Sequence, residues 1–121
     1  MSLLEEIKSI CKENNITLSR SKGQNFLIDE DVYNKIVELA ELDKDDVVLE
    51  VGPGLGYLTE RLAKKVKKVV AVELDDKLAL VLQEKFKKQE INNVEIVNED
   101  ILKLQVSVIL SPDARDEESL K

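Results

Sequence analysis

The sequence lacks histidine and tryptophan, and its 121 residues include a single cysteine, Cys11. A lone cysteine excludes an internal disulfide bond, and without histidine it leaves no credible zinc or haem site, so we expect no bound metal. No apolar run approaches the roughly 20 residues of a membrane-spanning helix. The N-terminus carries Glu5 and Glu6 after only two leucines and does not resemble a signal peptide. These absences predict a soluble, cytoplasmic protein without a membrane segment.

Aromatic residues are few, and the chain has no excess of positive charge. The chain has two Phe, two Tyr and 43% hydrophobic residues, which predicts one domain with an aliphatic core. Its net charge of -7 argues against a general nucleic-acid coat, because phosphate binding rests on lysine and arginine. Two local basic patches remain, Arg20 with Lys22, and the run Lys64, Lys65, Lys67 and Lys68. The second patch fits the solvated end of a helix, where the dipole favours cations.

Hydrophobic periodicity divides the chain into alternating helices and strands. Helices are expected at residues 3–11, 31–40, 59–65 and 76–88, and strands at 47–51, 69–73 and 94–97, with 106–110 as a candidate fourth strand. Strands that are apolar along their whole length are typical of parallel sheets whose two faces are both covered by helices.

The predicted fold class is therefore α/β, with a Rossmann-like parallel sheet and flanking helices. The pattern stops after about the fourth strand. Residues 1–110 are expected to form a partial domain of this kind, and residues 111–121, which are polar and contain a proline, are expected to form a frayed tail.

Three glycines, Gly52, Gly54 and Gly56, follow the first predicted strand directly. In an open parallel sheet this turn lies where ligands bind, and glycine lets a ligand approach the backbone closely. A tight turn alone needs only one or two glycines. The dinucleotide pattern G-x-G-x-x-G would require glycine at Tyr57, and no phosphate-binding P-loop sequence is present. The observed pattern, E-x-G-x-G-x-G, is associated with S-adenosylmethionine (SAM).

Two acidic residues stand at the carboxyl ends of the next two predicted strands, Glu73 as the last residue of the second strand and Asp100 shortly after the third. Glu73 stands about 20 residues after the glycines, where a carboxylate can accept hydrogen bonds from ribose hydroxyls. Asp100 follows the third strand, where it could accept a hydrogen bond from an adenine amino group. Either residue could instead be a solvated acid at a strand end, but their common position favours a nucleoside ligand.

Four segments resemble, in this order and spacing, the ribosomal RNA adenine N6,N6-dimethyltransferases of the KsgA type. They are GQNFLID at 23–29, VLEVGPGLGYLTERL at 48–62, AVELD at 71–75 and NEDIL at 98–102. The resemblance implies a Rossmann-like methyltransferase domain followed by a small helical domain, SAM as methyl donor, and two adjacent adenosines of small-subunit ribosomal RNA as acceptors. It also implies site roles for seven residues, with Asn25 and Leu27 at the methionine end of SAM, Gly52 and Gly54 lining the donor pocket, Glu73 on the ribose, and Asp100 with Ile101 on the adenine.

The family's catalytic motif, N-[LI]-P-[YF], is absent. The candidate fourth strand is followed by Ser111, Pro112, Asp113 and Ala114, so no catalytic residue is assigned. We expect the chain to be the N-terminal, SAM-binding portion of an rRNA (adenine-N6,N6-)dimethyltransferase, whose complete form acts on the small ribosomal subunit, and to be inactive by itself.

Three alternatives remain. One is a non-catalytic SAM-binding or ribosome-associated module. Another is a 23S ribosomal RNA adenine methyltransferase of the resistance type, whose glycine loop usually lacks the G-P-G-L-G form. An NAD-dependent oxidoreductase half-domain is disfavoured by Tyr57.

Overall fold

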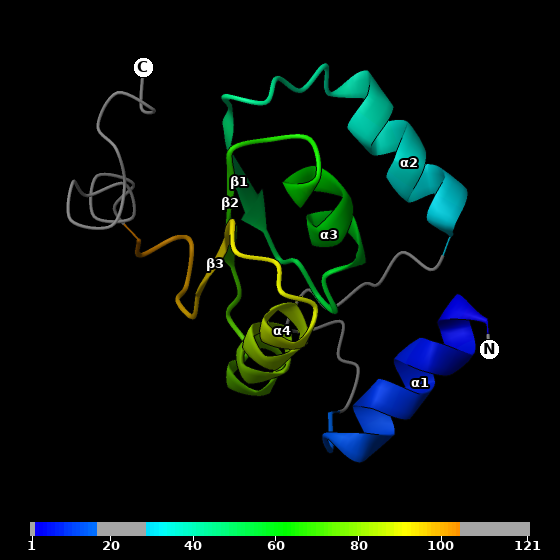
Figure 1. The fold of residues 1–121 in the computed structure, drawn as a ribbon. Helices are drawn as coiled ribbons and strands as arrows, with labels where there is room; N and C mark the ends of the chain where they lie inside the picture. The colour runs from blue at the N-terminus through cyan, green and yellow to red at the C-terminus, as the bar shows by residue number, and fades with distance from the viewer. Residues whose placement is uncertain (1, 17–28, 105–121) are drawn as a thin grey trace.

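The computed structural model describes residues 2–16 and 29–104. Within them the chain forms α1 (Leu3–Glu13), α2 (Glu30–Leu39), β1 (Val47–Val51), α3 (Tyr57–Ala63), β2 (Lys68–Val72), α4 (Asp76–Lys88) and β3 (Val94–Val97) (Figure 1). The predicted alternation of helices and strands is confirmed for this part of the chain. The candidate strand at 106–110 and the predicted tail at 111–121 lie outside the described residues.

The three described strands form one parallel sheet in the order β1-β2-β3. The pairing brings Val51 opposite Val72, and Val72 opposite Val97, so the three strands end at the same level. The Gly52 amide continues the ladder by donating to the Val72 carbonyl at 2.9 Å. The residues that directly follow the strands therefore meet along one edge of the sheet, as the sequence predicted.

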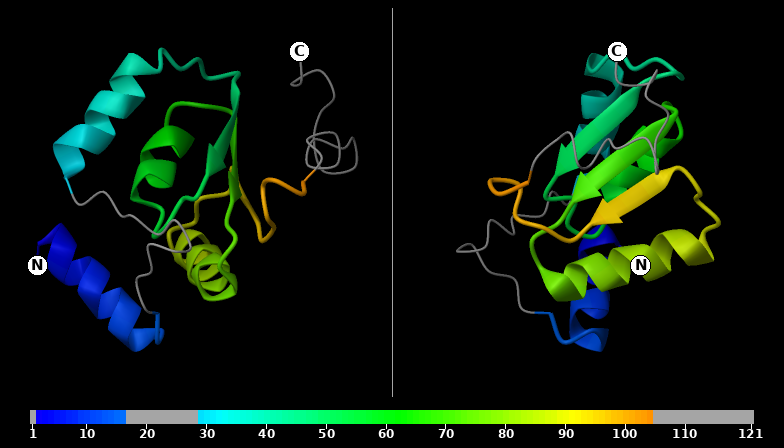
Figure 2. Two further views of the ribbon diagram at one scale, coloured as in Figure 1. Left: turned by 180° about the vertical axis from the view of Figure 1, so that it is seen from behind. Right: turned by 90° about the vertical axis from the view of Figure 1, so that its left-hand side faces the viewer.

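The described helices lie on one side of this sheet (Figures 1 and 2). Leu62 and Ala63 of α3 pack against Val69, which is fully buried. Helix α1 lies further out, and its Ile7 and Cys11 belong to a second buried cluster with Leu55 of the glycine loop. Among the described residues, the buried hydrophobic side chains are aliphatic except for Cys11, Tyr33, Tyr57 and Phe86, in line with the scarcity of aromatic residues.

The opposite face of the sheet is only partly covered by the described residues. The apolar runs predicted helices on both faces; within residues 2–16 and 29–104 the cover on this second face comes from Ile101 and Leu104, which pack against Val70 and Val72, so helical cover on this face stays a prediction. On the same face Leu49 is 44% exposed and Val51 is 56% exposed. An apolar run indicates that a strand is suited to burial, but it does not identify the segment that buries it.

Candidate functional site

The ends of the three strands bring Gly52, Glu73 and Asn98 to one edge of the sheet. Asn98 fastens this edge, because its Nδ2 donates to the carbonyls of Glu73 at 3.0 Å and Leu74 at 3.3 Å. The side chain therefore ties the end of β3 to the end of β2. We did not assign Asn98 a role from the sequence, because an asparagine after a strand is an ordinary turn residue.

All three glycines of the loop adopt positive φ, with values of 69° at Gly52, 60° at Gly54 and 82° at Gly56. A Cβ built on Gly52 would meet no heavy atom of residues 2–16 and 29–104 within 4 Å. A Cβ on Gly56 would lie 2.7 Å from Leu82 and 2.8 Å from Phe86. Gly52 thus faces open space that a ligand can use, whereas Gly56 lets α4 approach the loop from behind.

Glu73 lies at the centre of the edge and is 5% exposed. Burial raises the pKa of its carboxyl group, while hydrogen bonds from the backbone amides of Asp75 and Gly54 oppose that shift. The Asp75 amide donates to Glu73 Oε2 at 2.9 Å. The carboxylate therefore joins the end of β2 to the glycine loop, and in its charged form it is an acceptor for hydroxyl donors.

Glu50, the acid that precedes the glycines, pairs with α3. Its Oε1 accepts a hydrogen bond from Thr59 Oγ1 at 2.5 Å, and Thr59 is 0% exposed. Burial raises the Glu50 pKa, and the Thr59 hydrogen bond lowers it. The pair joins β1 to α3 across the loop. The sequence alone did not predict this contact, because it depends on how α3 is rotated against the strand.

The two residues predicted to contact adenine follow β3. Asp100 Oδ1 accepts the backbone amide of Leu102 at 2.9 Å, so the carboxylate stabilises its own turn. The Ile101 side chain packs with Val70 and Val72 on the second face of the sheet. Their contact with adenine remains a prediction, and Asn25 and Leu27, predicted at the methionine end, lie outside the described residues.

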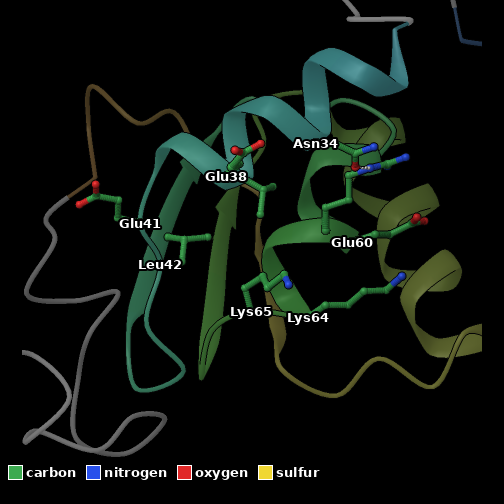
Figure 3. Close-up of a pocket in the computed structure, with 9 residues that line it drawn as sticks. Asn34, Glu38, Glu41, Leu42, Glu60, Lys64 and Lys65 are labelled. Atoms are coloured by element: carbon green, nitrogen blue, oxygen red, sulfur yellow. Dashed lines mark hydrogen bonds between the residues drawn. The ribbon is translucent and has the colours of Figure 1, made fainter.

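A groove of about 680 Å³ lies between α2 and α3, away from the strand ends. Figure 3 shows Glu38 of α2 and two lysines that follow α3, Lys64 and Lys65, around this groove. Its lining mixes acidic, basic and apolar side chains and includes no residue of the glycine loop. The groove is therefore separate from the site at the strand ends.

Within residues 2–16 and 29–104, no group of three or more His, Cys, Asp or Glu side chains is arranged to hold a metal ion. No helix in the same ranges has the length and apolar character needed to cross a membrane.

Comparison with known proteins identifies the family. The profile of the ribosomal RNA adenine dimethylase family matches residues 15–120. Ribosomal RNA small subunit methyltransferase A of Bacillus mycoides (strain KBAB4) is 43% identical over 104 residues, which is 86% of this chain and 35% of that relative. The chain thus spans about a third of the length of the curated relatives it matches.

Solved structures agree in fold. The 23S rRNA methyltransferase ErmE superimposes with a TM-score of 0.62 and 43% identity, over 67% of this chain and 32% of that one. A SAM-dependent methyltransferase from Aquifex aeolicus superimposes with a TM-score of 0.54 and 28% identity, over 60% of this chain and 40% of that one. The architecture is thus the Rossmann-like methyltransferase fold, and from its sequence match the chain belongs to the ribosomal RNA adenine dimethylase family.

Proposed function

We propose that this chain is the donor-binding portion of a SAM-dependent ribosomal RNA adenine dimethyltransferase, and that SAM binds at the edge formed by the ends of β1, β2 and β3. One observation carries the proposal. The strand register brings Gly52, which has open space above it, to the same edge as Glu73, a buried hydrogen-bond acceptor. This arrangement fits a ligand that needs close backbone approach and a hydroxyl acceptor.

Each predicted residue has a role in this proposal. Gly52 and Gly54 line the donor pocket, and Glu73 accepts hydrogen bonds from the ribose hydroxyls. Asp100 and Ile101 contact the adenine through the turn after β3. At the methionine end of SAM the proposal adds Asn25 and Leu27. When bound, SAM supplies an electrophilic methyl group, and the protein's own part is to hold that donor in a fixed orientation.

The proposed acceptor is small-subunit ribosomal RNA in the small ribosomal subunit, reached by the full-length protein in the cytoplasm. The Bacillus mycoides relative supports this assignment by its name and its 43% identity. ErmE, which acts on 23S rRNA, has the same identity over a smaller share of the chain. The wider match to the small-subunit enzyme decides our preference.

Titration with S-adenosylhomocysteine (SAH), the demethylated form of SAM, tests the donor site. We expect the wild-type chain to bind SAH and Glu73→Gln to bind it at least about tenfold more weakly, because the amide is a weaker acceptor for the ribose hydroxyls. Glu38→Gln removes an exposed carboxylate on α2 and is the matched control, with unchanged affinity expected. Equal affinity of wild type and Glu73→Gln would refute the ribose assignment. Absence of wild-type binding would refute the donor site in this chain.

A further inference from the structure

Helix α4 contacts the back of the glycine loop through one cationic side chain, Lys85. Its Nζ donates to the Leu55 carbonyl at 2.7 Å, and Leu55 stands between Gly54 and Gly56. The same Nζ forms an ion pair with Glu60 of α3 at 2.7 Å. It also lies 3.9 Å from the centre of the Tyr57 ring. One ammonium group therefore contacts the loop and the first turns of the helix that follows it.

The surroundings of Lys85 strengthen these contacts. The side chains of Lys85 and Glu60 are 16% and 21% exposed, so water screens the pair less than it screens an exposed ion pair. A charged donor also makes a stronger hydrogen bond to a carbonyl than a neutral donor does. The loop needs such a restraint, because three glycines at positive φ give its backbone wide conformational freedom when it is not held.

Lys85 belongs to a helix face that meets the loop along its length. Leu82 and Phe86 occupy the space that a side chain at Gly56 would need. Gln89 Nε2, one turn further on, donates to Glu60 at 3.2 Å. Helical spacing puts these residues and Lys85 on one side of α4. The face is therefore shaped to the loop, and Lys85 is the member of it that hydrogen-bonds the loop backbone.

The other end of α4 begins at the acid that we assign to the ribose. Asp75 caps α4 by accepting the amides of Lys77 at 2.9 Å and Leu78 at 3.1 Å. Its own amide donates to Glu73. Helix α4 thus contacts Glu73 through its N-terminal cap and the glycine loop through Lys85. It can fix the distance between the two halves of the candidate site.

From this geometry we propose that Lys85 is a positioning residue that holds the glycine loop in its binding conformation, acting through Leu55 and Glu60. The inference rests on the proposed SAM site. It requires that removing the ammonium group lowers SAH affinity even in chains that are fully folded.

The experiment compares three variants with wild type. Lys85→Met keeps most of the side-chain volume and removes the charge, Lys85→Arg restores a cation, and Lys87→Met removes an exposed lysine from the same helix turn. SAH affinity is measured by calorimetric titration at a temperature where each variant is folded by circular dichroism. Hydrogen exchange of the Leu55 to Tyr57 amides is measured without ligand.

We expect Lys85→Met to lose about ten- to a hundredfold in SAH affinity, with faster exchange at the loop amides. Lys85→Arg should recover most of the affinity, and Lys87→Met should match wild type. If Lys85→Met does not fold, Glu60→Gln provides the test, because it breaks the ion pair while retaining Lys85, and a smaller loss of affinity is expected.

Two results would overturn the proposal: a folded Lys85→Met or Glu60→Gln chain with wild-type affinity, or an equal loss in Lys87→Met, which would indicate a general charge effect. If the wild-type chain does not bind SAH, the proposed donor site is wrong. In that case the hydrogen exchange of the loop amides still tests Lys85. If these amides exchange at the wild-type rate in Lys85→Met, the positioning role is rejected as well. If they exchange faster, Lys85 restrains the loop even though the donor site is rejected.

Discussion

The carboxyl group of Glu73 is buried, and burial disfavours its ionised form. Burial raises the pKa of its carboxyl group despite the amides that donate to it. For an acid, a raised pKa in the folded state means that the fold binds the proton more tightly than the unfolded chain does. The contribution of this group to stability is therefore fully present below its ordinary pKa of 4.5 and is lost as the pH rises through the higher folded value.

The raised pKa of Glu73 predicts how the stability of Glu73→Gln differs from that of wild type as the pH changes. Glutamine cannot ionise, so the free energy of unfolding of wild type should fall relative to that of Glu73→Gln as the pH rises from about 4 to about 7. Glu50, whose pKa burial also raises, is present in both chains and contributes equally. Urea denaturation across this pH series measures the difference. A difference that stays constant with pH would contradict the buried, raised-pKa description of Glu73.

The Thr59 hydroxyl gives a second prediction at this scale. Thr59→Val keeps the shape of the side chain but removes the donor to Glu50, so we expect a loss of about 1–3 kcal/mol in unfolding free energy. Thr59→Ser keeps the hydroxyl and loses one methyl group, which should cost about 1 kcal/mol. Chemical denaturation of both variants separates the two effects. A greater loss in Thr59→Ser than in Thr59→Val would mean that packing outweighs the hydrogen bond.

Some site residues could be predicted from the sequence and others could not. Gly52, Gly54 and Glu73 could be assigned to the candidate site because each stands at a strand end or in a spaced motif, and parallel pairing brings strand ends together; their roles stay predictions. Lys85 has no such signal. Its partner Leu55 is 30 positions away, and the contact exists because of the rotation and tilt of α4 against the loop.

At the scale of elements, the glycine loop has open space at Gly52 and helix α4 packed against Gly56, so alanine at these two positions should differ in its effects on stability and on binding. Gly52→Ala has room for its Cβ, so its stability loss should be limited to the strain of positive φ, about 1–2 kcal/mol. Gly56→Ala adds a collision with Leu82 and Phe86 to the same strain, so it should lose about 1–3 kcal/mol more.

SAH affinity should rank the two variants the other way, with the greater loss in Gly52→Ala. The added methyl group at Gly52 enters the open space of the proposed donor pocket and should weaken SAH binding, whereas folded Gly56→Ala should retain more of it. Thermal unfolding and SAH titration of the two variants measure both orders. Similar stability losses in the two variants would contradict the packing of α4 against Gly56.

Element boundaries followed the sequence where a cap or an apolar run marked them. Strands β1 and β3 and helix α4 begin and end at the predicted residues. Helix α3 begins at Tyr57, two positions before the predicted start at 59, because its N-cap is Gly56 in a left-handed conformation without a side-chain cap. The cover of the second sheet face could not be predicted, since the strand sequence does not identify the segment that packs on it.

At the scale of the whole molecule, the sequence contains the residues proposed for the donor side, but it lacks the N-[LI]-P-[YF] motif expected on the acceptor side. We therefore expect the 121-residue chain by itself not to methylate RNA, because the reaction needs the acceptor nitrogen held close to and in line with the methyl group. The net charge of -7 also disfavours binding to the RNA backbone.

The assay incubates the chain with tritiated SAM and undermethylated small ribosomal subunits, with the full-length Bacillus mycoides relative as positive control. No label above background is expected from the chain. Label at adenosine that is abolished by Glu73→Gln would contradict this prediction and reveal an acceptor site within these residues.

Strands β1, β2 and β3 are neighbours in the sheet in the same order in which the ribosome synthesises them. Each backbone pairing in the described sheet joins consecutive strands, so each new strand meets a partner that has already been synthesised. Each parallel pairing needs only the one helix between its strands, α3 or α4, to have been synthesised, although pairing across such a crossover is slower than a contact between adjacent segments. The edge that carries Gly52 and Glu73 can therefore assemble during translation, once residues up to Asn98 have left the exit tunnel.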